Sequence, residues 1–150
     1  MTIRRRWIVT ILTCIVCMGG AAFGAPKSVE GVTTEYLNPD RPGHTIESLL
    51  QAADSTPWIP FDGSLNLGYQ DEPVWVRIDL GSARTDIALL EVAYPNLDVV
   101  DLYYVRGTEV LSTIRTGDRS PFEQRPWPHR HFIFPIADQE FDRLYLRVQT

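Results

Sequence analysis

Aromatic rings and planar polar groups occur together in the proline- and asparagine-rich parts of this sequence. In a sugar-binding site, an aromatic ring stacks on the apolar face of a pyranose, while Asp, Asn and Arg side chains orient its hydroxyl groups. The candidate rings are Trp58, Tyr69, Tyr94 and Trp127, and the candidate polar groups are Asn96, Asp98, Arg125 and His129. For most of these rings packing is the stronger alternative, as it is for Trp75 and Tyr103 in alternating strand-like runs. Trp127 stands between two prolines, so it is the best candidate for ligand contact.

His129 and His131 suggest a second kind of chemistry. On a strand, two residues separated by one other project from the same face, where their imidazoles could share a Zn²⁺ ion. Asp118 or Glu123 could complete the ligand set. The alternative is structural, with His129 hydrogen-bonded to loop carbonyls that the neighbouring prolines cannot satisfy. We favour the structural role, and therefore predict no metal site and no cofactor.

Motifs for hydrolysis or phosphoryl transfer are missing from the sequence. There is no Gly-x-Ser-x-Gly, no His-Glu-x-x-His and no glycine-rich phosphate loop that ends in Lys-Ser or Lys-Thr. A glycosidase needs only two suitably spaced carboxyl groups, and 19 acidic residues always allow such a pair on paper. We predict that the protein is not an enzyme, with a metal- or carboxylate-dependent hydrolase as the remaining alternative.

The first 24 residues have the three-part layout of a secretory signal segment. A basic stretch at residues 2–6 precedes an apolar stretch at 7–18 and a small-residue stretch at 19–25. The apolar stretch is shorter than the roughly 20 residues that a spanning helix needs, so cleavage is expected near Gly24 or Ala25. An uncleaved anchor over residues 7–23 is the alternative. Either way, the remainder is expected at the periplasmic face of the inner membrane.

Composition indicates one folded, acidic domain after this segment. Both cysteines, Cys14 and Cys17, lie inside the apolar stretch, so the rest of the chain can form no internal disulfide. The formal net charge is −5, and three arginines belong to the leader, which makes nucleic acid an improbable partner. A hydrophobic content of 44% argues against disorder and supports an ordinary core.

The elements expected after the leader are mostly short strands. Residues 25–43 predict an extended lead-in, and residues 44–54 a short helix capped by Thr45. From residue 58 the hydrophobic period becomes two, and turn residues separate the runs, which is typical of an antiparallel sandwich or barrel. Arg106-Gly107 predicts a hairpin turn, and the three prolines of residues 120–128 predict a loop or an edge. The expected strands are 65–69, 74–80, 87–93, 99–105, 109–114, 131–136 and 144–148.

An ordered set of short motifs links residues 35–150 to a known family. The set is Gly68-Tyr69, residues 73–77 (PVWVR), 91–98 (EVAYPNLD), 100–103 (VDLY), 116–118 (TGD), Pro121-Phe122, Arg125-Pro126, His129-Arg130, 132–135 (FIFP) and 144–148 (LYLRV). No single motif is diagnostic, but their order resembles the extracellular domain, type 2, of bacterial seven-transmembrane receptors with diverse intracellular signalling modules. The resemblance implies a jelly-roll-like antiparallel sandwich similar to carbohydrate-binding modules, so that with the short helix predicted above the fold class is all-β with one short helix. Residues 44–150 would form this domain, which we expect to be truncated at its C-terminal end.

The resemblance also implies a function. Such domains lie outside the inner membrane, ahead of transmembrane helices and cytoplasmic signalling modules that this chain does not include. We therefore expect a periplasmic ligand-sensing domain that binds carbohydrate or another small ligand. The alternative is a protein-interaction or homodimerisation sandwich without a small ligand. The residues expected to contact the ligand are Tyr69, Tyr94, Asn96, Asp98, Arg125, Trp127 and His129.

Overall fold

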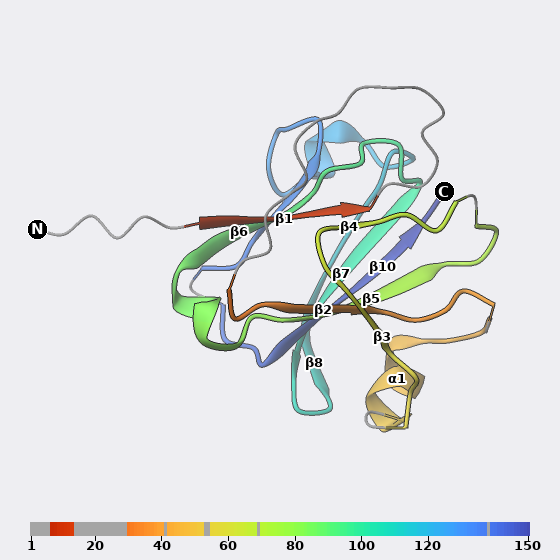
Figure 1. The fold of residues 1–150 in the computed structure, drawn as a ribbon. Helices are drawn as coiled ribbons and strands as arrows, with labels where there is room; N and C mark the ends of the chain where they lie inside the picture. Colours follow the sequence, from red (N-terminus) through yellow and green to blue (C-terminus); the bar gives the residue numbers. More distant parts are fainter. Residues whose placement is uncertain (1–6, 14–29, 41, 53–54, 69, 138) are drawn as a thin grey trace, which may run out of the picture.

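Two β-sheets and one short helix make up the computed structural model, which describes residues 7–13, 30–40, 42–52, 55–68, 70–137 and 139–150 (Figure 1). One sheet has the strand order β4 (Ser64–Leu65), β1 (Trp7–Thr13), β6 (Ile87–Val92), β9 (Phe132–Pro135). The other has the order β3 (Ile59–Phe61), β2 (Thr33–Tyr36), β5 (Val74–Asp79), β10 (Arg143–Gln149), β7 (Val99–Arg106), β8 (Glu109–Thr116). The helix is α1 (Ile46–Ala52), and short 3₁₀ turns cover Gly81–Thr85 and Phe122–Gln124. The all-β class with one short helix is confirmed, while the jelly-roll connection pattern stays a prediction.

Strands β7 and β10 are neighbours inside the six-stranded sheet, where residues 99–105 pair with residues 143–149. Their antiparallel register runs from Arg143 opposite Val105 to Gln149 opposite Val99. Alternate β7 residues, such as Leu102 and Tyr104, are buried towards the second sheet. Tyr103, on the other face, is buried as well. Both faces of this strand pair are therefore covered, as expected for a central strand.

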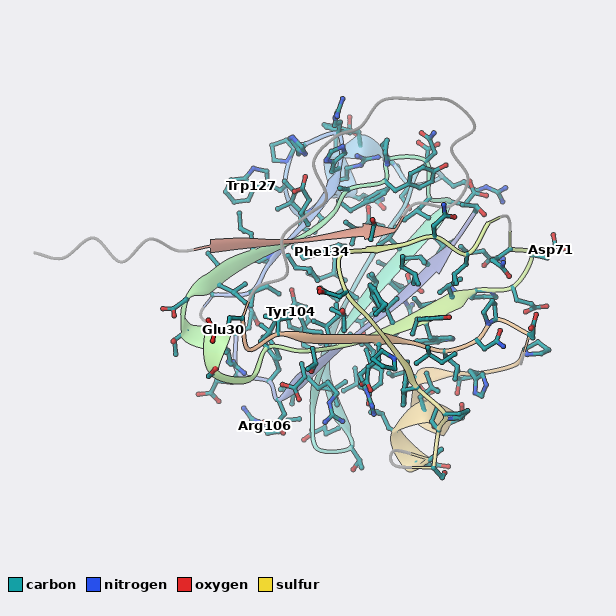
Figure 2. All side chains as sticks on the ribbon, in the orientation of Figure 1. Glu30, Asp71, Tyr104, Arg106, Trp127 and Phe134 are labelled. Atoms are coloured by element: carbon teal, nitrogen blue, oxygen red, sulfur yellow. The ribbon has the colours of Figure 1, made fainter. Side chains whose placement is uncertain are left out.

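The main core lies between the two sheets. Strands β6 and β9 contribute Leu90, Val92, Phe132 and Phe134, which pack against the inward residues of β5, β7 and β10. A polar contact also crosses the core, since the Tyr104 hydroxyl donates a hydrogen bond to the Pro135 carbonyl at 2.6 Å. Figure 2 shows Tyr104 and Phe134 in the interior of the molecule. The hydrogen bond satisfies a hydroxyl that would otherwise be buried without a partner.

The helix covers part of the outer face of the six-stranded sheet. It buries Ile46, Leu49 and Leu50 in a second cluster that includes Trp75 and Tyr145. The predicted cap is confirmed, because the Ser48 N–H donates to Thr45 Oγ1 at 3.3 Å and the Thr45 N–H to Ser48 Oγ at 3.0 Å. A helix of 7 residues is too short to be stable alone, so this packing maintains it.

Several local predictions are confirmed and others need adjustment. Strands β7 and β8 form the expected hairpin, with Gly107 at φ +56° between paired Arg106 and Glu109. The strand expected over 65–69 is only Ser64–Leu65, because the Asn66 side chain accepts the Gly68 N–H and turns the chain. Strand β3, not expected, contains Pro60 and lies at the edge of its sheet, where the missing N–H costs little.

Part of the predicted signal segment has regular structure. Residues Trp7–Thr13 form β1, which pairs in parallel with β6 and with β4 (Figure 1). The expected cleavage site near Gly24 or Ala25 lies outside the described residues, so the signal segment stays a prediction. Strand β2 lies within the predicted lead-in and pairs with β5.

The buried Tyr104 hydroxyl should make a pH-dependent contribution to the free energy of unfolding. Burial raises the pKa of Tyr104, so the folded state favours the neutral phenol that donates to Pro135. This contribution is complete at neutral pH and is lost as the pH rises beyond about 10, where an unfolded tyrosine ionises. Tyr104→Phe should therefore lower the free energy of unfolding by about 1 to 2 kcal/mol at pH 7.

Urea denaturation at several pH values checks this expectation. The difference between Tyr104→Phe and the unchanged protein should shrink above pH about 10. Tyr36→Phe, at a half-buried tyrosine on β2, serves as the control. A Tyr104→Phe difference that stays constant between neutral and alkaline pH would contradict the assignment.

Candidate functional site

The candidate site is built on the segment that joins β8 to β9, residues 117–131, called here the β8–β9 loop. Strand β8 ends beside the start of β7, and β9 begins beside the end of β6. The loop therefore lies at the same end of the sandwich as residues 93–98, which join β6 to β7. The two segments touch, because the Asp118 N–H donates to the Leu97 carbonyl at 2.7 Å. A side chain in place of Gly117 would collide with the Asp98 carbonyl oxygen, so glycine permits this approach.

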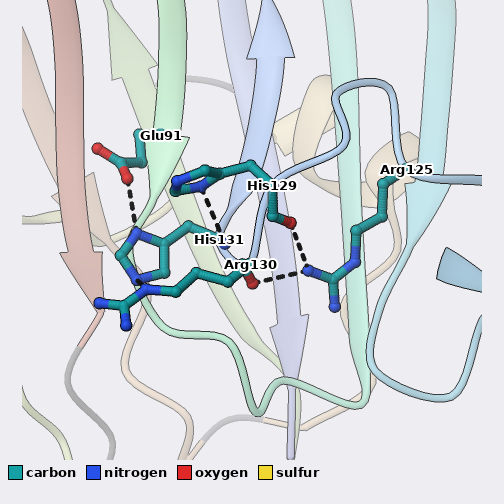
Figure 3. A network of polar contacts seen from close by, with 5 residues as sticks. All are labelled: Glu91, Arg125, His129, Arg130 and His131. Carbon is teal, nitrogen blue, oxygen red and sulfur yellow. Dashed lines mark hydrogen bonds and ion pairs between the residues drawn. The ribbon is translucent and has the colours of Figure 1, made fainter.

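Arg125 holds the β8–β9 loop in one conformation. Its Nη1 donates to the carbonyl oxygens of His129 at 2.9 Å and of Arg130 at 2.7 Å (Figure 3). The guanidinium carbon also lies 5.1 Å from the centre of the Phe122 ring and 4.4 Å from that of Phe132. A planar cation with several fixed donors suits this combination of hydrogen bonding and stacking. Arg125 thus ties the loop to the first residue of β9.

Two aromatic rings of this loop are open to solvent. Trp127 and Phe122 are each 50% exposed, although both are large and apolar. The Trp127 carbonyl accepts the His129 N–H at 2.8 Å, which places the tryptophan in the same tightly bonded turn. Figure 2 shows Trp127 at the periphery of the molecule. An ordered loop with exposed rings can provide a flat stacking surface for a ligand.

The two histidines meet, although neither lies on the expected strand. Strand β9 begins at Phe132, and residues 129–131 form the bend before it. Their ring centres are still 5.2 Å apart, with planes at 81°. The carboxylate beside them comes from Glu91 on β6, at 2.6 Å from His131 Nδ1, and not from the expected Asp118 or Glu123. His129 Nδ1 accepts the His131 N–H, and Arg125 donates to the loop carbonyls of His129 and Arg130.

The remaining predicted contact residues have different surroundings. Tyr94 is half-buried against the main core, whereas Asn96 is exposed in the 93–98 segment. Asp98 forms an ion pair with Arg119 of the β8–β9 loop at 2.7 Å. Tyr69 lies outside the described residues. The structure therefore joins the two loops that carry Asp98 and Trp127.

Of the candidate rings, Trp58 instead serves packing, as Trp75 and Tyr103 do. The Trp58 ring lies 5.9 Å from that of Tyr145 and beneath the Arg77 guanidinium, on the face that α1 covers. Trp75 and Tyr103 stack at 5.7 Å with planes 29° apart, which confirms their predicted role between strands. These rings stabilise the outer face of the six-stranded sheet.

Sequence reasoning missed a groove of about 400 Å³ between the start of α1 and the outer face of β7, β8 and β10. Burial and the neighbouring Asp101 carboxylate both raise the pKa of the Tyr103 hydroxyl in this groove, which keeps it neutral and able to donate. Strand alternation could have located the groove, because it assigns Asp101, Tyr103 and Arg147 to the outer face. The lining includes His44, Glu47, Trp75, Asp101, Tyr103 and Arg147.

The contacts of Arg125 predict a local effect of a conservative substitution. Arg125→Lys keeps the charge but loses the planar fork that donates to two carbonyls and stacks on two rings. Amide hydrogen exchange in residues 121–131 should then become faster, while the global stability changes little. Hydrogen-exchange mass spectrometry measures this directly. Arg119→Lys, at a largely exposed position of the same loop, is the control and should leave the exchange unchanged.

Comparison with known proteins identifies the family. The family model 7TMR-DISM extracellular 2 matches residues 33–150, which include every strand from β2 to β10. No curated protein and no solved structure matches the chain. In the described part of the chain, no helix is long and apolar enough to cross a membrane. The family consists of extracellular domains of membrane receptors, which suggests a sensing role and agrees with a periplasmic location. The resemblance predicted from the sequence is thereby confirmed, and the chain belongs to the 7TMR-DISM extracellular 2 family.

Proposed function

We propose that this domain senses a soluble ligand in the periplasm, that the ligand is a carbohydrate, and that the β8–β9 loop contacts it. The observation that carries this proposal is the half-exposed Trp127 ring on a loop held in place by Arg125. A preformed stacking surface binds with a smaller entropic cost than a loop that must first become ordered. Binding without catalysis is proposed, because sensing requires occupancy only.

The charges around the two joined loops suit a ligand with many hydroxyl groups. Arg119 and Asp98 form a partly exposed ion pair, and Asn96 is exposed nearby along the chain. Such groups can donate to and accept from hydroxyls in fixed directions, while Trp127 and Phe122 cover an apolar ring face. We propose that Tyr94, another predicted contact residue, contributes from the 93–98 segment, while a ligand contact by Tyr69 stays a prediction.

In the parent receptor, occupancy of this domain would be passed to transmembrane and cytoplasmic signalling modules. The β8–β9 loop is well placed for such coupling, because Arg125 links it to Phe132 at the start of β9. A ligand can shift a conformational equilibrium only by its difference in affinity for the two states. A loop fixed to a core strand could provide that difference through its packing.

A second candidate function is homodimerisation or protein binding without a small ligand. Strand β8 favours it, because this strand is 8 residues long, lies at the edge of its sheet, and exposes most of its side chains. Leu111 on β8 is 37% exposed. An unpaired strand edge can pair with another chain.

Isothermal titration against a panel of glycans tests the primary proposal. We expect saturable heat from at least one glycan, and Trp127→Ala should weaken that binding by about tenfold or more. Leu111→Ala is the matched control, since it also removes an exposed apolar side chain but lies on β8. This control should bind as tightly as the unchanged protein.

Other outcomes of the titration would redirect the proposal. Binding that survives Trp127→Ala but is lost in Arg115→Ala would move the site to the groove beside α1, which Arg115 lines. If the folded protein gives no binding heat with any glycan of the panel, the carbohydrate proposal is contradicted. Concentration-dependent self-association of that protein would then support the dimerisation alternative.

A further inference from the structure

Three side chains able to bind a metal ion converge at the base of the β8–β9 loop. Glu91 comes from β6, whereas His129 and His131 come from the bend before β9. One nitrogen or oxygen atom of each lies within 4.8 Å of the others. Figure 3 shows the carboxylate and the two rings gathered on one side of the loop, away from the Arg125 guanidinium.

The register of β6 and β9 explains why residues 40 positions apart meet. Val92 pairs with Phe132, and both side chains are buried in the core. Because side chains alternate along a strand, Glu91 and His131, each one residue before this pair, project from the opposite face. They are diagonal neighbours across the two chains, a separation that a glutamate and an imidazole can bridge. Glu91 Oε1 lies 2.6 Å from His131 Nδ1.

The hydrogen bonds indicate which ring nitrogens could bind an ion. Arg130 Nε donates to His131 Nε2 at 3.1 Å, so a neutral His131 ring carries its proton on Nδ1, towards Glu91. His129 Nδ1 accepts the His131 N–H at 3.1 Å, which leaves its Nε2 for an ion. A divalent cation would bind His131 Nδ1 and Glu91 in place of their hydrogen bond, with His129 as the third ligand. The proton of the neutral His131 ring would then lie on Nε2, so Arg130 would turn away from that nitrogen.

The donor set and its geometry fit a zinc-type ion. Two imidazoles and one carboxylate form a common zinc ligand set, with bonds of about 2.0–2.2 Å and a further position for water. Bringing the three atoms to those bond lengths needs shifts on the order of 1 Å. His129 is exposed and can rotate, whereas Glu91 and His131 have side chains only 19% and 16% exposed. Two anchored ligands and one adjustable ligand can therefore close around an ion.

We propose that Glu91, His129 and His131 bind a divalent transition-metal ion of the zinc type. The ion joins the β8–β9 loop to β6, in addition to the link that Arg125 makes to β9. Its open coordination position can hold water or a ligand group. Metal binding at these residues does not depend on the carbohydrate proposal, because every ligand belongs to this chain.

Zinc titration of the full chain by calorimetry tests the site. The protein should carry no histidine tag, and Cys14→Ser with Cys17→Ser removes thiolates that would compete for zinc. We expect one Zn²⁺ per chain, and His129→Ala should weaken binding by at least about tenfold, since even outer partners of a metal site contribute that much. His44→Ala is the matched control, because His44 is the third histidine of the chain and lines the groove beside α1.

Arg130 provides a test that a purely structural cluster would not pass. Its guanidinium is exposed and contacts His131, so it repels a bound cation. Arg130→Gln should therefore bind zinc several-fold more tightly. Glu91→Gln, which keeps the size of the side chain but loses its charge, should bind more weakly. Circular dichroism establishes that each variant is folded.

Cobalt supplies a spectroscopic readout of the same ligands. Co²⁺ should give visible absorption bands in the unchanged and His44→Ala proteins, and these bands should disappear in His129→Ala. Failure of the folded protein to bind zinc or cobalt would overturn the proposal. Equal metal binding by His129→Ala, Glu91→Gln and the unchanged protein would also overturn it, because the ion would then lie elsewhere.

Discussion

Burial of the β7–β10 strand pair on both of its faces is the constraint on which the rest of the structure depends. Its inward face, with Leu102 and Tyr104, requires the sheet that contains β6 and β9, and its outward face, with Tyr103, requires α1. The Tyr104 hydroxyl donates to Pro135 across the core and so also joins β7 to β9. Strand β7 also pairs with β8, so that β7 begins where β8 ends, and this second pairing brings residues 93–98 and the β8–β9 loop together. The position of the candidate site is therefore a consequence of the core.

The Arg125 side chain connects this scaffold to the surface that we assign to ligand binding. Arg125 satisfies two loop carbonyls and lies over one exposed and one fully buried ring, so it joins solvent-facing Phe122 to core residue Phe132. Below it, Glu91 contacts His131 at the end of β6. An event at the loop surface therefore has a short physical path to β6 and β9, two neighbouring strands of the four-stranded sheet. Such an arrangement suits a sensory domain, whose ligand must alter packing as well as occupy a site.

Much of the fold could be predicted from the sequence because its signals are local. Alternation between Val74 and Asp79 predicted β5, and Gly107 predicted the hairpin turn. The prolines of residues 120–128 predicted the loop, and the ordered motifs of the sequence predicted the family. The Glu91–His131 contact could not be predicted, because it depends on the register of two strands 40 residues apart. Arg125 was predicted as a ligand contact. Its hydrogen bonds to loop carbonyls could not be predicted, because they depend on the conformation of an irregular loop that has no repeating sequence pattern. The short β4 resulted from an Asn66 side-chain hydrogen bond that hydrophobic alternation does not reveal.

The claim that the β8–β9 loop forms the sensory surface is tested most directly by nuclear magnetic resonance of the isotopically labelled protein. Assigned amide signals and the indole N–H signal of Trp127 would be followed while glycans are added. Binding at the loop predicts concentration-dependent shifts of the Trp127 indole signal and of amides in residues 93–98 and 117–131. The groove beside α1 and the β8 edge should remain unperturbed. Shifts confined to residues 44–47, 101–103 and 115, or no shifts for any glycan with a folded spectrum, would contradict it.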